Sequence, residues 1–332
     1  MKRAVHKPLD LEALERGVVE GDRATLARAI TLVESEREQD RQLAAALLER
    51  LRPRTGSALR VGISGVPGAG KSTLLDALGV RLVAQGRKLA VLAVDPSSQK
   101  SGGSILGDKT RMAGLAREEN AFIRPSPSGK TLGGVARKTR ESMLVCEAAG
   151  YDLVFVETVG VGQSETSVAD MVDLVVLVLL AGAGDELQGI KRGVLEVADA
   201  ILVQKADGDG LLRAQRAKKD LTVALSLLRG SDPNGPPPVT LSSALEGTGL
   251  KELMAWLESE RAARQRDGRF ETRRRAQAKS SFWSLIDEGL ARSFKTSPEV
   301  GKLLPKMEAD VAAGTLDPAQ AADAILAAYR GH

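Results

Sequence analysis

One short run of residues limits the possible folds of this chain more than any other feature. It lies between an apolar stretch and a helical pattern and consists of Gly65, Val66, Pro67, Gly68, Ala69, Gly70, Lys71, Ser72 and Thr73. This is the complete pattern G-x-x-x-x-G-K-[ST], in which backbone N–H groups wrap a polyphosphate at the positive end of a helix. We therefore expect a phosphate-binding loop, with Lys71 reaching the β- and γ-phosphates and Ser72 able to bind Mg²⁺.

From residue 60 onward, short β-branched runs alternate with helical stretches. We expect strands at 60–64, 89–95, 121–124, 152–157, 174–180, 200–204 and 239–241. We expect helices at 71–85, 107–118, 132–149, 187–197, 211–229 and 249–263. Strands that are apolar on both faces and alternate with helices are typical of a parallel sheet covered on both sides. The pattern predicts an α/β P-loop NTPase fold with a mostly parallel central sheet flanked by helices.

Helical patterns flank this α/β unit on both sides. Apolar residues recur at spacings of three and four through residues 9–52, where Asp22 can cap a second helix. Residues 260–332 are again helical, and Pro298 and Pro318 lie in the first turns of two late helices. We expect three parts: an N-terminal helical extension at 1–57, a P-loop domain at 58–259 and a C-terminal helical arm at 260–332.

The charge balance argues against a dedicated nucleic-acid binder. The 332 residues include 47 Lys and Arg and 43 Asp and Glu, a net charge of only +4. Only nine residues are aromatic (five Phe, two Trp and two Tyr), so base-stacking platforms are not expected. The basic stretch at 261–279 is interpreted as a solvated helix face, with ion pairs to a second subunit as the sharper alternative.

Metal-binding and membrane-spanning classes are also disfavoured. Cys146 is the one cysteine, and His6 and His332 lie at opposite ends of the chain, so a His/Cys metal site and an intrachain disulfide are not expected. The basic start of the chain is not followed by an apolar run, and no apolar run approaches the ~20 residues of a membrane helix. We expect a cytoplasmic protein without a membrane partner.

Acidic residues after two strands are candidates for a metal site. Glu157 closes its strand at the position where P-loop enzymes carry an acid for Mg²⁺, and Asp95 ends another strand beside the loop. Asp108 follows in a polar Gly/Ser-rich segment, and Gln163 is a candidate for orienting the attacking water. The alternatives are an Asp-Pro turn for Asp95, a helix cap for Asp108 and a surface position for Gln163.

A second group of residues predicts which base is bound. Gln204, Lys205 and Asp207 end a strand and match the guanine-reading motif N-K-x-D, with Gln in place of the usual Asn. The Asp207 carboxylate can accept hydrogen bonds from guanine N1–H and the exocyclic amine, a donor pair that adenine lacks. After a later strand come Ser243, Ala244 and Leu245, where a GTPase places a backbone N–H on guanine O6. These elements favour GTP over ATP; an exposed strand-to-loop pair is the alternative for Lys205 and Asp207.

Together these motifs resemble the MeaB/ArgK family of P-loop GTPases. The resemblance covers the chain from about residue 10 to the C-terminus and is most specific at 94–98, 101–112, 157–165 and 182–191. The last of these segments resembles the third switch of the family, although Ala181 stands where a proline commonly precedes the first glycine.

The resemblance implies a homodimeric GTPase chaperone of an adenosylcobalamin-dependent acyl-CoA mutase, chiefly methylmalonyl-CoA mutase. Such a chaperone gates cofactor loading or protects the mutase from inactivation. GTP, GDP and Mg²⁺ would be bound by this chain, whereas adenosylcobalamin would belong to the mutase. The resemblance also implies that the C-terminal arm contributes to dimerisation. We expect Asp185, Glu186 and Lys191 to form a partner-responsive loop, with Lys191 or an acid joining the catalytic set when the mutase docks.

Three other functions remain alternatives. A kinase or ATPase linked to basic amino-acid transport would need an acceptor and a positioned base, and no residue is singled out for either role. A nickel-delivery GTPase would need a His/Cys site, which the composition disfavours. A signal-recognition GTPase would need an RNA- or membrane-binding domain, and no such segment is evident.

Overall fold

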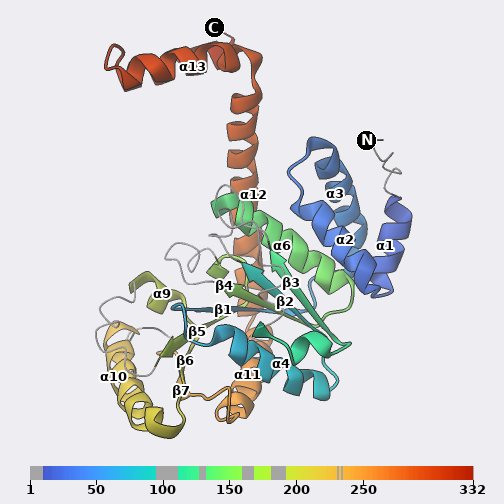
Figure 1. Ribbon diagram of the computed structural model, residues 1–332, viewed down its shortest axis with the longest axis vertical. Coiled ribbons are helices and arrows are strands. Elements are labelled where there is room, and N and C mark those ends of the chain that lie inside the picture. Colours follow the sequence, from blue (N-terminus) through green and yellow to red (C-terminus); the bar gives the residue numbers. More distant parts are fainter. Residues whose placement is uncertain are drawn as a thin grey trace. The chain divides into compact units, whose positions relative to one another are not determined.

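A seven-stranded parallel sheet forms the centre of the computed structural model (Figure 1). The structure describes residues 10–94, 111–126, 132–158, 168–180, 192–229, 232 and 235–331. The strands are β1 Leu59–Gly65, β2 Leu89–Val94, β3 Ala121–Ser126, β4 Leu153–Thr158, β5 Leu174–Leu180, β6 Ala200–Gln204 and β7 Val239–Leu241. Their order in space is β3-β2-β4-β1-β5-β6-β7, and all neighbouring pairs are parallel. The predicted α/β P-loop fold is confirmed.

Helices cover both faces of the sheet because alternate strand residues point to opposite sides. On one face, Val154 and Val156 of β4 join a core with α6 (Leu132–Ala148) and the N-terminal helices. On the other face, Leu153 and Phe155 pack with α4 (Lys71–Ala84) and α11 (Leu250–Arg266). Toward the β7 edge, β5 and β6 form a third cluster with α9 (Arg192–Val197) and α10 (Leu211–Arg229).

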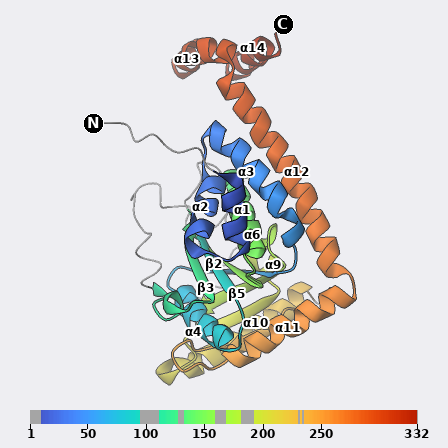
Figure 2. The ribbon, with the colours of Figure 1, turned by 90° about the vertical axis from the view of Figure 1, so that its right-hand side faces the viewer.

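Three helices precede the sheet and pack against α6 (Figure 2). They are α1 (Leu11–Val19), α2 (Arg23–Glu34) and α3 (Glu38–Leu51), followed by the 3₁₀ helix η1 (Arg52–Arg54). The Asp22 carboxylate accepts a hydrogen bond from the Thr25 N–H and caps α2, as its position after Gly21 predicts. The buried Glu34 carboxylate pairs with Arg124 of β3 at 2.6 Å, which ties the helical extension to the sheet edge.

One predicted helix ends earlier than expected. Of the helix that we expected at 107–118, Arg111 is α-helical, and the residues after it form a turn and the 3₁₀ helix η3 (Leu115–Arg117). The Asp76 carboxylate of α4 accepts a hydrogen bond from the Leu115 N–H at 2.7 Å and approaches Gly114 closely. This side-chain bond offers the backbone an alternative to an α-helical turn.

The chain divides into two compact units, one ending at Gln277 and the other covering 278–332. The helix α12 (Arg269–Thr296) is continuous across this division. In the second unit, α13 (Pro298–Ala312) and α14 (Pro318–Arg330) begin at the two prolines, as predicted, and Ser297 and Asp317 cap them. Tyr329 donates a hydrogen bond to the Ser293 hydroxyl at 2.8 Å and packs edge-on against Phe294. The domain boundary expected at 259/260 stays a prediction.

The interpretation of the basic stretch at 261–279 as a solvated face is wrong for two of its arginines. Arg264 is 8% exposed and pairs with Asp199 and Glu260. The Arg274 side chain is 16% exposed and pairs with Asp173. The basic pattern gave no sign of the pairs with Asp199 and Asp173 because these two acids lie 65 and 101 positions from the arginines that bind them.

No helix in the described ranges is long and apolar enough to cross a membrane.

Candidate nucleotide-binding site

The phosphate-binding loop joins β1 to α4, and its backbone requires glycine at both ends. Gly65 has a φ of +146°, and a Cβ there would lie 2.0 Å from the Val178 carbonyl oxygen. Gly70, with a φ of +84°, precedes the first helical residue, Lys71. An L side chain is strained at either φ, so the glycines of the motif are needed for the turn itself.

The Lys71 ammonium group lies against the loop that would hold phosphate. Lys71 is 6% exposed, and its Nζ donates hydrogen bonds to the carbonyls of Gly65 at 2.8 Å and Val66 at 3.0 Å. The cation is therefore desolvated and held at the N-terminus of α4, where the helix dipole also favours a negative ligand. This arrangement suits the binding of phosphoryl oxygens.

The structure brings Ser72 and Glu157 together. The Ser72 hydroxyl donates to Glu157 Oε1 at 2.7 Å, although the two residues come from α4 and β4. Glu157 is 7% exposed. One residue farther along β4, the Thr158 hydroxyl donates to Ser64 Oγ at 3.2 Å, which joins the ends of β4 and β1. Hydroxyl and carboxylate oxygens are the ligands that Mg²⁺ prefers.

The predicted base-reading residues follow the end of β6. Gln204 is 2% exposed, and its Nε2 donates to the Ser242 hydroxyl at 3.4 Å. Lys205 has a φ of +58°, the one positive value among the non-glycine residues in the described part of the chain. Gly210 lies under this turn, where a Cβ would be 2.5 Å from the Lys205 carbonyl oxygen. The backbone thus bends sharply between the strand and Asp207.

A second loop, after β7, holds the first one in place. The Ser243 hydroxyl donates a short hydrogen bond to Asp207 Oδ2 and accepts one from the Glu246 N–H at 3.1 Å. The Ala206 N–H donates to the Ser242 carbonyl at 3.1 Å. These contacts fix the Asp207 carboxylate beside the backbone that was predicted to read guanine O6. Leu245, the last residue of that predicted group, is 85% exposed.

Six predicted site residues lie outside the described residues: Asp95, Asp108, Gln163, Asp185, Glu186 and Lys191. Within the described residues, no group of three or more His, Cys, Asp and Glu side chains could hold a metal ion. Ser72 and Glu157 are therefore the described part of the candidate Mg²⁺ site.

One contact near the site was not expected from the sequence: the Thr158–Ser64 bond, which joins residues of two different strands. The sequence indicates that the Gln204 amide ties loops together, as the usual Asn does, but it does not specify Ser242 as the partner. The adjacent hydroxyls of Ser242 and Ser243 were the one available signal, and a role was predicted only for the backbone there. Pairs of this kind are set by the strand order, which single motifs do not specify.

The chain matches a family model described as "Methylmalonyl Co-A mutase-associated GTPase MeaB" over residues 26–299. It is 52% identical over 321 residues to a putative GTPase of Caulobacter vibrioides, a match that covers 97% of this chain and 98% of that protein. It is also 51% identical over 263 residues to the GTPase ArgK of Escherichia coli, with 79% and 80% of the two chains covered.

A solved structure has the same fold over nearly the whole chain. It is described as the crystal structure of LAO/AO transport system kinase, and it is 38% identical in sequence with a TM-score of 0.74. The match covers 96% of this chain and 98% of that one.

Proposed function

Because this chain belongs to the MeaB family of P-loop GTPases, and therefore binds guanine nucleotides and hydrolyses GTP, we propose that it is a chaperone of an adenosylcobalamin-dependent acyl-CoA mutase. The partner that we propose is methylmalonyl-CoA mutase. The observation that carries this proposal is the family match over residues 26–299, since its description names that enzyme. The chaperone would gate cofactor loading or protect the mutase, and adenosylcobalamin would stay with the mutase.

We place the nucleotide along the carboxyl ends of β1, β4 and β6. Residues 65–73 would wrap the phosphates, and Asp207 would accept hydrogen bonds from guanine N1–H and the exocyclic amine. The bond from Ser243 to one Asp207 oxygen supports this role because it orients the carboxylate before a base arrives. Gln204 would hold the two base-reading loops together through Ser242, and Leu245 and the stem of Lys205 would lie beside the base.

The residues present fit a magnesium ion. The Ser72 hydroxyl and Glu157 carboxylate are hard oxygen donors that already lie within hydrogen-bonding distance of each other. We propose that they hold Mg²⁺ together with Asp95 and Asp108. When bound, the ion would neutralise charge on the β- and γ-phosphate oxygens. Lys71 would stabilise the same charge, and Gln163 would orient the water that attacks.

Three further features belong to the proposal. Asp185, Glu186 and Lys191 would respond to the docked mutase and make hydrolysis depend on it. The region 260–332 would act as a dimerisation arm, so that the protein works as a homodimer. The family model matches that region as far as residue 299, which supports a shared architecture for its first half.

The experiment combines co-purification with kinetics. Purified chain and methylmalonyl-CoA mutase from the same host are mixed with GDP or GTP and separated by size-exclusion chromatography, and GTP turnover is measured with and without saturating mutase. We expect a complex and a changed turnover. Retained GTP hydrolysis without a complex in any nucleotide state would contradict the mutase proposal and leave the GTPase assignment intact.

The similar crystal structure, which is described as a transport system kinase, supports a second candidate, a kinase linked to amino-acid transport. The two candidates differ in where the γ-phosphate goes. With γ-labelled GTP, a hydrolase releases all of the label as inorganic phosphate, whereas a kinase transfers label to a protein. We expect full release as phosphate, also in the presence of host extract.

A further inference from the structure

A set of polar side chains from α11 and α12 binds the opposite end of the sheet from the nucleotide site. We call it the arginine clasp and define it as Arg264, Arg273, Arg274 and Gln277. The clasp contacts Asp173 and Asp199, which precede β5 and β6, and the short turn at 168–172. The clasp has two parts with different chemistry.

The first part pairs arginines with buried acids. Arg274 donates to both carboxylate oxygens of Asp173, from Nε at 2.8 Å and Nη2 at 2.7 Å, and Asp173 is 1% exposed. Arg264 donates to Asp199 at 2.6 Å and to the Asp173 carbonyl at 2.9 Å. Burial acts to lower the pKa of Arg264, but Asp199 and then Glu260 offset it, and the pKa is raised overall. These pairs are fixed structural anchors.

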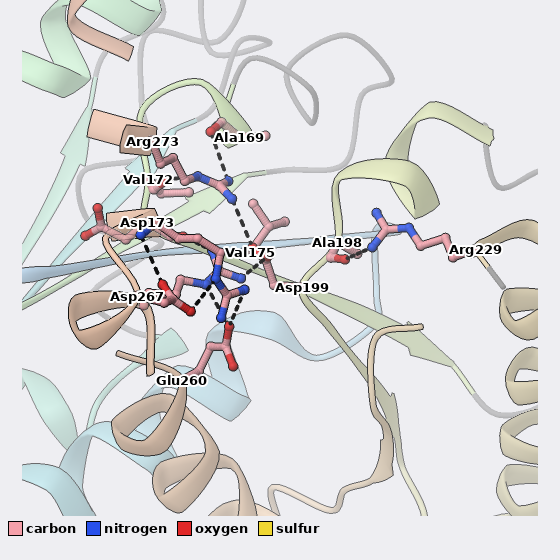
Figure 3. Close-up of polar contacts among 12 residues, drawn as sticks. Ala169, Val172, Asp173, Val175, Ala198, Asp199, Arg229, Glu260, Asp267 and Arg273 are labelled. Carbon is pink, nitrogen blue, oxygen red and sulfur yellow. Dashed lines mark hydrogen bonds and ion pairs between the residues drawn. The ribbon is translucent and has the colours of Figure 1, made fainter. Parts of the chain in front are cut away.

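The second part binds backbone carbonyls. Arg273 donates from Nε to the Val172 carbonyl at 3.0 Å and from Nη2 to the Ala169 carbonyl at 3.2 Å, and its Nη1 lies 3.5 Å from Asp199 Oδ2. Gln277, one turn farther along α12, donates from Nε2 to the same two carbonyls at 2.7 Å and 3.4 Å. Figure 3 shows Arg273 extending toward Ala169 and Val172. Two side chains of α12 therefore share one turn and hold it through neutral carbonyls.

The turn at 168–172 also touches the strand that carries the phosphate-binding loop. A Cβ on Gly62 would lie 2.5 Å from Val168 Cγ1 and 3.1 Å from Val172 Cγ2, so the turn packs directly on β1. Three residues after Gly62, the Gly65 carbonyl accepts the hydrogen bond from Lys71. In the sequence, the turn follows the connection that leaves β4 after Thr158, the neighbour of Glu157. The packing of Val168 and Val172 on Gly62 is the described contact between the turn and the strand that leads into the phosphate-binding loop.

We propose that Arg273 and Gln277 are positioning residues that couple the nucleotide state to α12 through the turn at 168–172. The proposal rests on the nucleotide site proposed above. GTP and GDP would favour different positions of the turn at 168–172. Through Arg273 and Gln277, each position of the turn would favour a different conformation of α12, which continues to Thr296. Coupling is reciprocal, so a constraint on α12 beyond Gln277 also changes the relative affinity for GTP and GDP.

The test uses hydrogen–deuterium exchange on the full-length chain with GDP or a non-hydrolysable GTP analogue. In the wild type we expect exchange at 278–296 to differ by about fivefold or more between the two nucleotides, the lower end of ordinary coupling between sites. In the double variant Arg273→Met/Gln277→Leu the two exchange rates become equal. The matched control is Arg275→Met, which alters an exposed arginine of the same helix and keeps the wild-type difference.

Calorimetry on each variant first confirms that both nucleotides bind, which keeps failure of the nucleotide site distinct from failure of the coupling. If the double variant does not fold, Gln277→Ala replaces it, and we expect it to reduce the difference by at least about half. Nucleotide-independent exchange at 278–296 in the wild type would overturn the proposal. A folded double variant that keeps the wild-type difference in exchange between GDP and the GTP analogue would also overturn the proposal.

Discussion

At the carboxyl ends of the strands, Lys71 donates to two backbone carbonyls and Ser72 donates to Glu157. At the amino ends, Asp173 binds Arg274 through both of its oxygens, and Asp199 binds Arg264. The first end holds a desolvated cation and oxygen groups that suit phosphoryl oxygens and Mg²⁺. At the second end, the charged groups pair with one another. The difference supports the proposal that the first end binds the nucleotide, whereas the arginine–aspartate pairs of the second end anchor α11 and the start of α12.

The largest effect is expected at Lys71. Lys71→Ala removes a charge that strengthens its contacts as the transition state develops, so turnover of saturating GTP should fall by about a hundredfold or more. Turnover is measured as phosphate release by the purified protein, with EDTA-treated wild type as the control without Mg²⁺. Turnover that survives both the substitution and EDTA would show that the activity belongs to another site.

At the opposite end, Arg274→Met should mainly affect stability. It leaves the buried Asp173 carboxylate without its guanidinium partner, and breaking a buried pair in this way costs about 3 kcal/mol of unfolding free energy. Urea unfolding of the variant, compared with Arg275→Met, measures the loss. A loss no larger than that of the exposed control would mean that the pair contributes no net stability.

Base selectivity should depend on Asp207. Asp207→Asn places an amide NH₂ donor against the guanine N1–H donor. We therefore expect GTP affinity to fall by about tenfold, the loss of roughly one hydrogen bond to a charged group. Xanthosine triphosphate, whose O2 can accept from that amine, should bind better to the variant than to the wild type. Calorimetry with both nucleotides checks this. Unchanged GTP preference would place the base site elsewhere.

The smallest effect is a pH dependence at Tyr151, just before β4. Burial raises the pKa of Tyr151 to about 12, whereas a phenol in the unfolded chain titrates near ~10. The folded state therefore favours the neutral form. The stability that follows is present below about pH 10 and is lost as the pH rises toward 12. Thermal melts of wild type and Tyr151→Phe should diverge above pH 10 in favour of the variant, and parallel curves would contradict this.

The residues at the proposed nucleotide site could be predicted because they lie close together in the sequence. Residues 65–73 form the loop within one strand–helix connection, and Gln204, Lys205 and Asp207 follow one strand, so local patterns place them. The Ser72–Glu157 contact also followed, since parallel strands bring their carboxyl ends to one edge.

The amino end could not be predicted in this way. The Arg274–Asp173 pair spans 101 positions, and the basic pattern around Arg274 is equally typical of a solvated helix. Choosing between the two requires the packing of α12 on the turn at 168–172. The sequence likewise did not specify Ser242 as the partner of the Gln204 amide, because this contact depends on β6 and β7 being neighbours in the sheet.

If Lys71 serves the nucleotide and the Arg274–Asp173 pair serves stability, one paired measurement should separate the two roles. Turnover of saturating GTP and unfolding free energy in urea are both measured for Lys71→Ala and Arg274→Met. We expect Lys71→Ala to lose about a hundredfold in turnover while its unfolding free energy stays within about 1 kcal/mol of wild type. Arg274→Met should lose about 3 kcal/mol while its turnover per folded molecule stays within about threefold. Equal losses of turnover and of unfolding free energy in both variants would show that the two ends of the sheet do not have separate roles.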